Sequence, residues 1–167
     1  MTTLAIADWR AWAPGIVAAA DWATWANEPY RPTETPDQPD CAWLPPMQRR
    51  RLTRMARMCM HVAWPLCADD EQLPFVYASR HGETTRTLPL LRDVAAGTPL
   101  SPTQFGLSVH NAIAGQWSIL RGQRAESTTL AGGLDTFEHA MVEAGLLLGE
   151  GAAAVIVVIA EEYPPAA

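Results

Sequence analysis

The stretch Glu126-Ser-Thr-Thr-Leu-Ala-Gly-Gly-Leu-Asp-Thr-Phe-Glu-His-Ala-Met141 predicts a short β-strand, a tight turn of small residues and then a helix. Such a junction in an α/β protein is a usual place for a nucleophile or an anion, because the first turn of a helix presents free N–H groups and a positive dipole. No Cys, Ser or Lys stands at the tip of this turn, where Leu130 is followed by Ala131 and two glycines. The sequence therefore predicts the geometry of a site without a reactive group.

The helix after this turn is expected to bury one apolar stripe and to place Asp135, Glu138 and His139 largely elsewhere. The predicted stripe comprises Leu134, Phe137, Met141, Ala144 and Leu148.

The rest of the chain alternates strands with helices. Apolar runs predict buried strands at 74–79 and 152–160 and a short first strand at 4–7. Periodicity and capping residues predict helices from Pro46 to about Trp64, from 84 to 95, from Ser101 onward and over 109–120. A proline-rich loop is expected at 27–46. This order indicates one α/β domain over residues 1–167, with a mixed, mostly parallel sheet and helices on its faces.

Composition argues against several classes of protein, including nucleic-acid-binding, metal-binding and membrane-spanning proteins. The net charge of −6 argues against a nucleic-acid partner, and all the basic residues are arginines. Cys41, Cys59 and Cys67 lack metal-ligand spacing and suit free thiols in a reducing compartment, and no phosphate-binding loop or signal peptide is evident. The most apolar segment is too short for a membrane span of about 20 residues. We therefore expect a cytoplasmic protein without metal, cofactor or membrane span.

Two polar groups are candidate sites. Arg50, Arg54 and Arg57 share a face of the predicted helix after Pro46, which is either a solvated face or a docking surface for an acidic partner such as an acyl carrier protein. Arg80, His81 and Glu83 follow a predicted strand at its C-terminal end, where they either fix a turn or contact a substrate or partner.

Several motifs, in order along nearly the whole chain, resemble the N-terminal half of the β-ketoacyl synthases, which have a thiolase-like fold. They are the Arg-rich residues 48–58, residues 101–105 followed by 110–115 (His-Asn-Ala-Ile-Ala-Gly), and residues 128–133 (Thr-Thr-Leu-Ala-Gly-Gly). The last of these is similar to the Thr-Ala-Cys-Ala-Ser-Gly nucleophile elbow, with Leu130 at the position of the cysteine. Residues 78–83 (Ala-Ser-Arg-His-Gly-Glu) and 108–111 (Ser-Val-His-Asn) resemble the chain-length-factor-like members, which are associated with clusters for aryl polyene pigments and related polyketides or fatty acids.

The resemblance implies a subunit without catalysis of its own. Condensation needs a thiolate and an oxyanion hole, and Leu130 can do no covalent chemistry. The synthases also draw two catalytic residues from a C-terminal half that we do not expect in this chain. The resemblance implies dimerisation through a strand edge, with a second copy or with a full-length ketosynthase. The candidate interface comprises Glu126, Ser127, Thr128, Thr129, Leu130, His110 and Asn111.

Two other functions stay open. One is acyl transfer or condensation by a residue other than cysteine, such as Ser127 with His139. The other is a docking module for an acyl carrier protein that acts through Arg50, Arg54 and Arg57.

Overall fold

The computed structural model describes residues 3–33 and 35–165, which form two compact units, 3–66 and 67 onward. Each unit is described by itself. Among the described residues, no helix combines the length and the apolar character that crossing a membrane requires.

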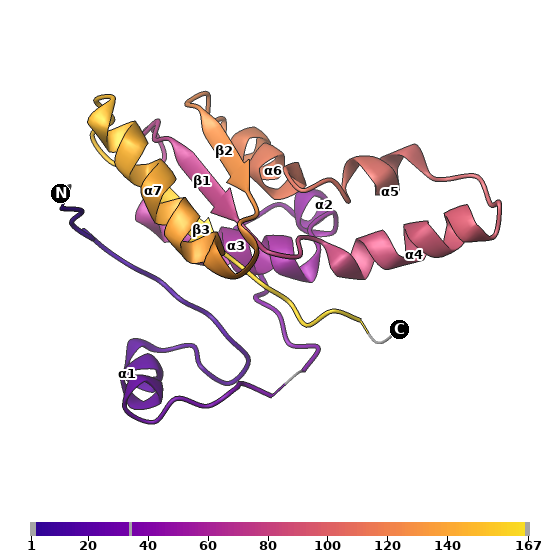
Figure 1. The fold of residues 1–167 in the computed structure, drawn as a ribbon, viewed down its shortest axis with the longest axis horizontal. Coiled ribbons are helices and arrows are strands. Elements are labelled where there is room, and N and C mark those ends of the chain that lie inside the picture. Colours follow the sequence, from indigo (N-terminus) through magenta and orange to yellow (C-terminus); the bar gives the residue numbers. More distant parts are fainter. Residues whose placement is uncertain (1–2, 34, 166–167) are drawn as a thin grey trace. The chain divides into compact units, whose positions relative to one another are not determined.

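A three-stranded parallel sheet lies at the centre of the second unit (Figure 1). β1 (Phe75–Ala78) is the middle strand, with β2 (Ser127–Leu130) on one side and β3 (Ile156–Ile159) on the other. All four residues of β1 are buried, as a strand with two neighbours and two covered faces requires. The predictions of an α/β fold and a parallel sheet are confirmed.

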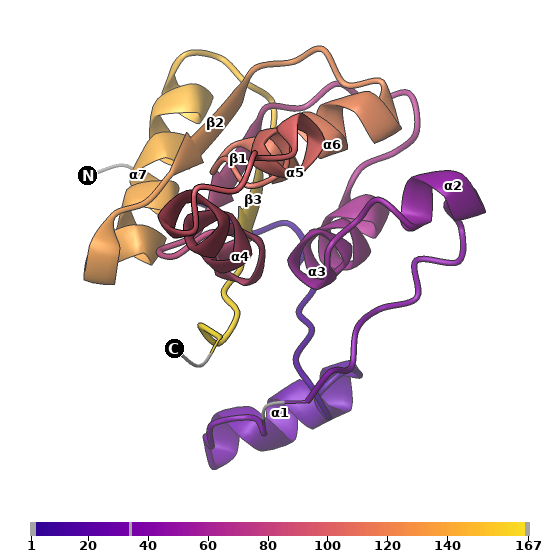
Figure 2. The same cartoon turned by 90° about the vertical axis from the view of Figure 1, so that its right-hand side faces the viewer.

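Two helices cover the two faces of this sheet (Figure 2). On one face, Trp117 of α6 (Ala112–Arg121) stacks on Phe75 at a ring-centroid distance of 4.9 Å. On the other face, Ala140 and Leu147 of α7 (Thr136–Gly149) pack with Val76 and Ala78 of β1. Because successive strand residues point to opposite faces, β1 contributes to both layers.

The remaining helices of this unit precede α6. α4 (Thr84–Ala95) and α5 (Pro102–Gly106) lie side by side and are connected by a short loop (Figure 1). α4 has the predicted bounds, and Gly97 follows it at a φ of 68°. The Ser101 hydroxyl accepts a hydrogen bond from the N–H of Gln104 at 3.4 Å, which confirms the predicted N-cap of α5.

Two predictions for this unit are correct only in part. The strand expected to be fully buried at 152–160 is the four-residue edge strand β3, and Ile159 is 39% exposed. Of the stripe expected to be buried along α7, Ala144 is buried and Met141 and Leu148 are half-buried, but Leu134 and Phe137 are 83% and 58% exposed. The buried residues of α7 are Thr136, Ala140, Ala144 and Leu147. The two alanines let the helix axis approach the sheet, while the exposed Phe137, Val142 and Leu146 lie away from it.

The first unit contains α1 (Ala19–Asn27), α2 (Pro46–Arg49), α3 (Arg54–Ala63) and the 3₁₀ helix η1 (Trp64–Leu66). No strand forms at 4–7, so that prediction is wrong. The long helix predicted from Pro46 is broken at 50–53, because the Thr53 hydroxyl accepts the N–H of Ala56 at 3.1 Å and starts α3 anew. Pro65 ends α3, as predicted. The described part of the proline-rich loop, residues 28–33 and 35–45, contains no helix or strand.

Candidate functional site

The elbow between β2 and α7 is formed as the sequence predicts. β2 ends at Leu130, and the 3₁₀ turn η2 (Gly133–Asp135) leads directly into α7. Gly133 adopts a φ of 64°, in the left-handed region that favours glycine. Leu130 is half-buried and packs against the cluster of Val76, Ala78, Ala140 and Leu147. Its side chain is therefore part of the core.

The Thr136 side chain forms two hydrogen bonds with the backbone of the turn. Its hydroxyl accepts the Gly132 N–H at 3.1 Å and donates to the carbonyl oxygen of Gly133 at 2.9 Å. An oxyanion hole needs N–H groups that point at the developing charge. The Gly132 N–H is already satisfied by a buried side chain, so it cannot serve as that donor while this bond is formed.

His139 also lies against the turn. Its Nδ1–H donates to the carbonyl oxygen of Asp135 at 2.7 Å, which is an i to i−4 contact on α7. A Cβ atom on Gly132 would be 2.5 Å from this Nδ1, so only glycine leaves room for the ring. The histidine therefore fixes the start of the helix.

The structure does not bring Ser127 to His139. The Thr128 hydroxyl donates to Glu143 of α7 at 2.7 Å, so Thr128 faces α7. Its neighbours Ser127 and Thr129 face the opposite side of the sheet, because side chains alternate along a strand. Ser127 and His139 therefore lie on opposite sides of the sheet and cannot form a catalytic pair.

β2 has a free edge. The carbonyl oxygen of Glu126 accepts the N–H of Phe75, the first residue of β1, and that of Leu130 accepts the N–H of Ser79, the residue after β1. In a parallel ladder, residues that bond the neighbouring strand alternate with residues that point away. The N–H and C=O groups of Ser127 and Thr129 therefore point to the outer edge, which meets no strand among the described residues. This is the geometry of a strand that can accept another.

The polar residues after β1 form a locked turn around a serine that the sequence reasoning did not single out. The Ser79 hydroxyl accepts the Gly82 N–H at 2.9 Å, and the Ser79 carbonyl accepts His110 Nε2–H at 2.8 Å. Gly82 has a φ of 63°, and a Cβ there would be 3.1 Å from Cδ2 of His110. A serine three residues before a glycine, here Ser79 and Gly82, is the local sequence pattern that could have predicted this turn. The predicted interface residue His110 is thus half-buried against the turn, whereas Asn111 is exposed.

The three candidates in this turn have different surroundings. Arg80 and His81 are exposed, and the Arg80 N–H donates to the Glu161 carboxylate beyond β3. Glu83 is buried and directly precedes α4. The arrangement supports the interpretation that the motif fixes the connection from strand to helix.

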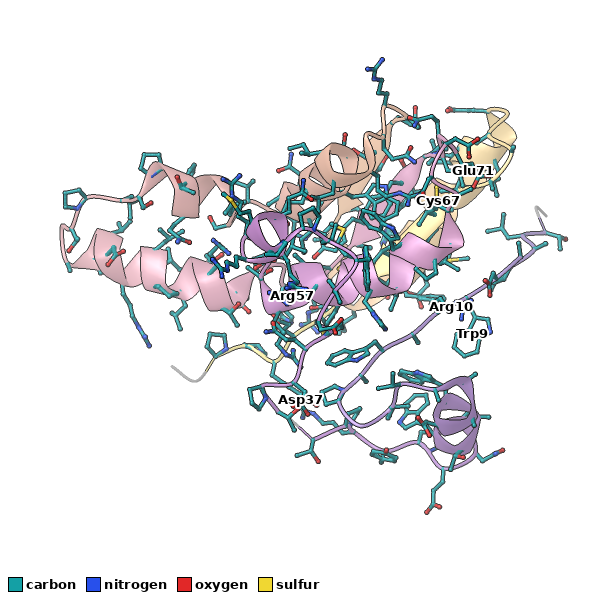
Figure 3. All side chains as sticks on the ribbon, turned by 180° about the vertical axis from the view of Figure 1, so that it is seen from behind. Trp9, Arg10, Asp37, Arg57, Cys67 and Glu71 are labelled. Carbon is teal, nitrogen blue, oxygen red and sulfur yellow. The ribbon has the colours of Figure 1, made fainter. Side chains whose placement is uncertain are left out.

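The arginines of the first unit hold the proline-rich loop. Arg54 donates to the carbonyl oxygen of Asp37 at 2.7 Å and stacks over Trp12. Arg57 donates to the carbonyl oxygens of Asp40 and Arg49 at 3.2 and 2.9 Å; Figure 3 labels Arg57 and Asp37. Arg50 is exposed in the break between α2 and α3. Docking of a carrier protein here stays a prediction, and of the three candidates Arg50, Arg54 and Arg57, only Arg50 is exposed.

A buried arginine joins the segments that precede β1 and β2. The Arg121 guanidinium donates to Asp69 at 2.9 Å and to the carbonyl oxygens of Cys67 and Ala68 at 2.7 and 2.6 Å. Gln123 adds a bond to the carbonyl of Glu71; Figure 3 labels Cys67 and Glu71. Sequence reasoning missed this latch, because its partners are more than 50 residues apart.

The cysteines are buried free thiols. Burial raises the pKa of Cys41 to about 11, which keeps this thiol protonated at neutral pH. In the part of the chain that the structure describes, no three His, Cys, Asp or Glu side chains gather as a metal ion would need.

Comparisons with known proteins agree with these observations. The family model for the β-ketoacyl synthase N-terminal domain matches residues 22–167. A solved structure titled as the ketosynthase ApeO in complex with its chain length factor ApeC, from Xenorhabdus doucetiae, is similar to this chain. The TM-score is 0.88 at 32% sequence identity, and the match covers 99% of this chain and 70% of that chain. No curated protein matches the sequence.

Proposed function

Because this chain belongs to the β-ketoacyl synthase N-terminal domain family, with its thiolase-like fold, we propose that it is a non-catalytic, chain-length-factor-like subunit that associates with an active ketosynthase. The acyl chains handled by that pair would be those of aryl polyene, polyketide or fatty acid synthesis.

One observation carries this proposal: the elbow keeps its strand, turn and helix but has no nucleophile. Leu130 packs into the core, and the Gly132 N–H in the turn that follows is bonded to the Thr136 hydroxyl. A scaffold without a nucleophile at this turn can still present the edge of β2. The edge then serves association, and the chemistry resides in the partner.

The proposal is tested by proline substitution on that edge. Thr129→Pro removes a backbone N–H that points to the outer edge of β2. It leaves the hydrogen bonds between β2 and β1 in place, because the backbone N–H and C=O of Thr129 point away from β1. Thr129→Val is the matched control, since it keeps the N–H and the β-branched shape. We expect this chain to bind the full-length ketosynthase of the same gene cluster, Thr129→Val to bind equally, and Thr129→Pro to bind at least about ten-fold more weakly in sedimentation velocity.

Two results would contradict the proposal. The first is a wild-type chain that does not bind the ketosynthase at micromolar concentration. The second is an acyl group found covalently on this chain after incubation with an acylated carrier protein.

A further inference from the structure

Part of the proline-rich loop of the first unit lies along α3, and we call residues 37–44 the strap. The carbonyl oxygen of Asp37 accepts the Arg54 Nε–H at 2.7 Å, and the carbonyl oxygen of Asp40 accepts an Arg57 N–H at 3.2 Å. Because both pairs are 17 residues apart in the sequence, the strap and α3 run in the same direction. Two arginines of α3 therefore hold the first half of the strap.

The second half of the strap is anchored by its own side chains. Cys41 and Leu44 are buried, and the Cys41 thiol donates to the carbonyl oxygen of Arg57 at 3.5 Å. The Leu44 N–H donates to the Cys41 carbonyl oxygen at 3.0 Å, so the chain turns here. This turn brings the residue between its ends, Trp43, to the end of α3.

Trp43 contacts two rings at the end of α3. Its ring centroid lies 6.1 Å from that of His61 on α3 and 6.1 Å from that of Trp64 in η1. His61 is half-buried, whereas Trp43 is 44% exposed, so the indole is one of the groups that keep water from the imidazole. Burial lowers the pKa of His61, because a protonated imidazole is poorly solvated in this position.

The charged groups around His61 come from the strap and from α3. The Asp40 carboxylate of the strap raises the pKa of His61, but the lowering by burial is the larger effect. Arg57 is four residues before His61 on α3 and adds a positive charge on the same face of the helix. η1 (Trp64–Leu66) has no titratable side chain. Protonated His61 is therefore less compatible with the closed strap than neutral His61.

We propose that the strap is a pH-sensitive clasp, whose Trp43 end opens when His61 is protonated while its Asp37 end stays bound to α3. When Trp43 moves away, water reaches the imidazole, and the open strap binds a proton more tightly than the closed strap does. The closed strap is therefore favoured at neutral pH, and opening increases as the pH falls below 6.5. The Asp37 end does not respond in this way, because an arginine keeps its charge over the whole range.

Hydrogen exchange of the wild-type chain between pH 7.5 and 5.0 tests this proposal, with each rate divided by the intrinsic rate at the same pH. The reporter is the amide of Leu44, which is bonded to the Cys41 carbonyl oxygen. We expect its corrected rate to rise by at least about three-fold between pH 7.0 and 5.0. Protection of the α3 amides should not change, because the helix stays folded when the strap opens.

Three variants assign the effect to His61. His61→Phe keeps an aromatic ring but cannot titrate, so the corrected rate of the reporter should stay constant. His81 is exposed after β1, so His81→Gln is the matched control and should behave as the wild type. Asp40→Asn removes the charge that favours protonated His61 in the closed strap but keeps the Oδ1 that accepts the Ala42 N–H. It should therefore increase opening at pH 5.0.

Each of four results would overturn the clasp. They are a reporter rate that does not depend on pH in the wild type, a rise that persists in His61→Phe, and less opening in Asp40→Asn than in the wild type. The fourth is an equal loss of protection in α3, which would mean that the first unit unfolds as a whole. The measurements use this chain alone, so their outcome does not depend on the proposed association with a ketosynthase.

Discussion

Gly82→Ala tests whether the turn after β1 is a structural lock. Gly82 has a φ of 63°, and an added Cβ would lie 3.1 Å from Cδ2 of His110. The left-handed backbone costs a residue with a Cβ about 1–2 kcal/mol. Displacement of the ring also threatens the bond from His110 to the Ser79 carbonyl, which adds about 1 kcal/mol. We expect the free energy of unfolding to fall by about 2–3 kcal/mol.

Gly97→Ala is the control for this substitution. Gly97 has nearly the same φ, 68°, but an added Cβ would meet nothing within 4 Å. Gly97→Ala should therefore cost only the backbone term, about 1 kcal/mol less than Gly82→Ala.

A double-mutant cycle with His110→Ala then identifies the source of the difference. In the His110→Ala background, Gly82→Ala should cost the same as Gly97→Ala. The assay is urea unfolding followed through hydrogen exchange of the β1 amides, which report on the second unit alone. Equal costs for Gly82→Ala and Gly97→Ala in the wild-type background would show that His110 does not restrict position 82, as would an excess cost of Gly82→Ala that persists without His110.

Four further predictions concern other contacts and two buried titratable groups. Thr136→Val should destabilise the chain by about 1 kcal/mol in urea unfolding, because the Gly132 N–H loses its acceptor, and Thr136→Ser should restore it. Arg121→Met should cost roughly 3 kcal/mol and increase hydrogen exchange over residues 67–72, with partial recovery in Arg121→Lys; unchanged exchange there would rule out the latch. The pKa of Cys41 is about 11 in the folded chain against an ordinary value of 9.0, so its alkylation at pH 9 should be far slower before than after unfolding. The stability from this thiol should fall as pH rises from 9 to 11, since the unfolded chain then binds fewer protons. Burial lowers the pKa of His61, so stability should fall as pH drops below 6.5 and this fall should be smaller in His61→Phe.

Local signals in the sequence predicted the elements around the elbow. β-branched residues define β2, the glycine pair defines the turn, and Ser101 and Gly97 mark helix ends. These signals depend on neighbours within about five residues, so the sequence contains them directly.

Contacts between distant residues could not be predicted in the same way. α7 has apolar residues on nearly every side, so periodicity could not identify the face that Ala140 and Ala144 turn to the sheet. The sequence predicted Arg54 and Arg57 to form a basic helix face. It could not show that they bond carbonyl oxygens of the proline-rich loop, because those partners are 17 residues away. The same reason hid the latch of Arg121.

The proposed function has two parts: this chain assembles with a ketosynthase, and it performs no acyl chemistry itself. Native mass spectrometry of this chain mixed with the full-length ketosynthase of the same gene cluster and an acylated carrier protein tests both parts at once. We expect a complex that contains both chains, with the acyl group on the ketosynthase after dissociation in the gas phase. Separate masses for the two chains, or an acyl adduct on this chain, would contradict it.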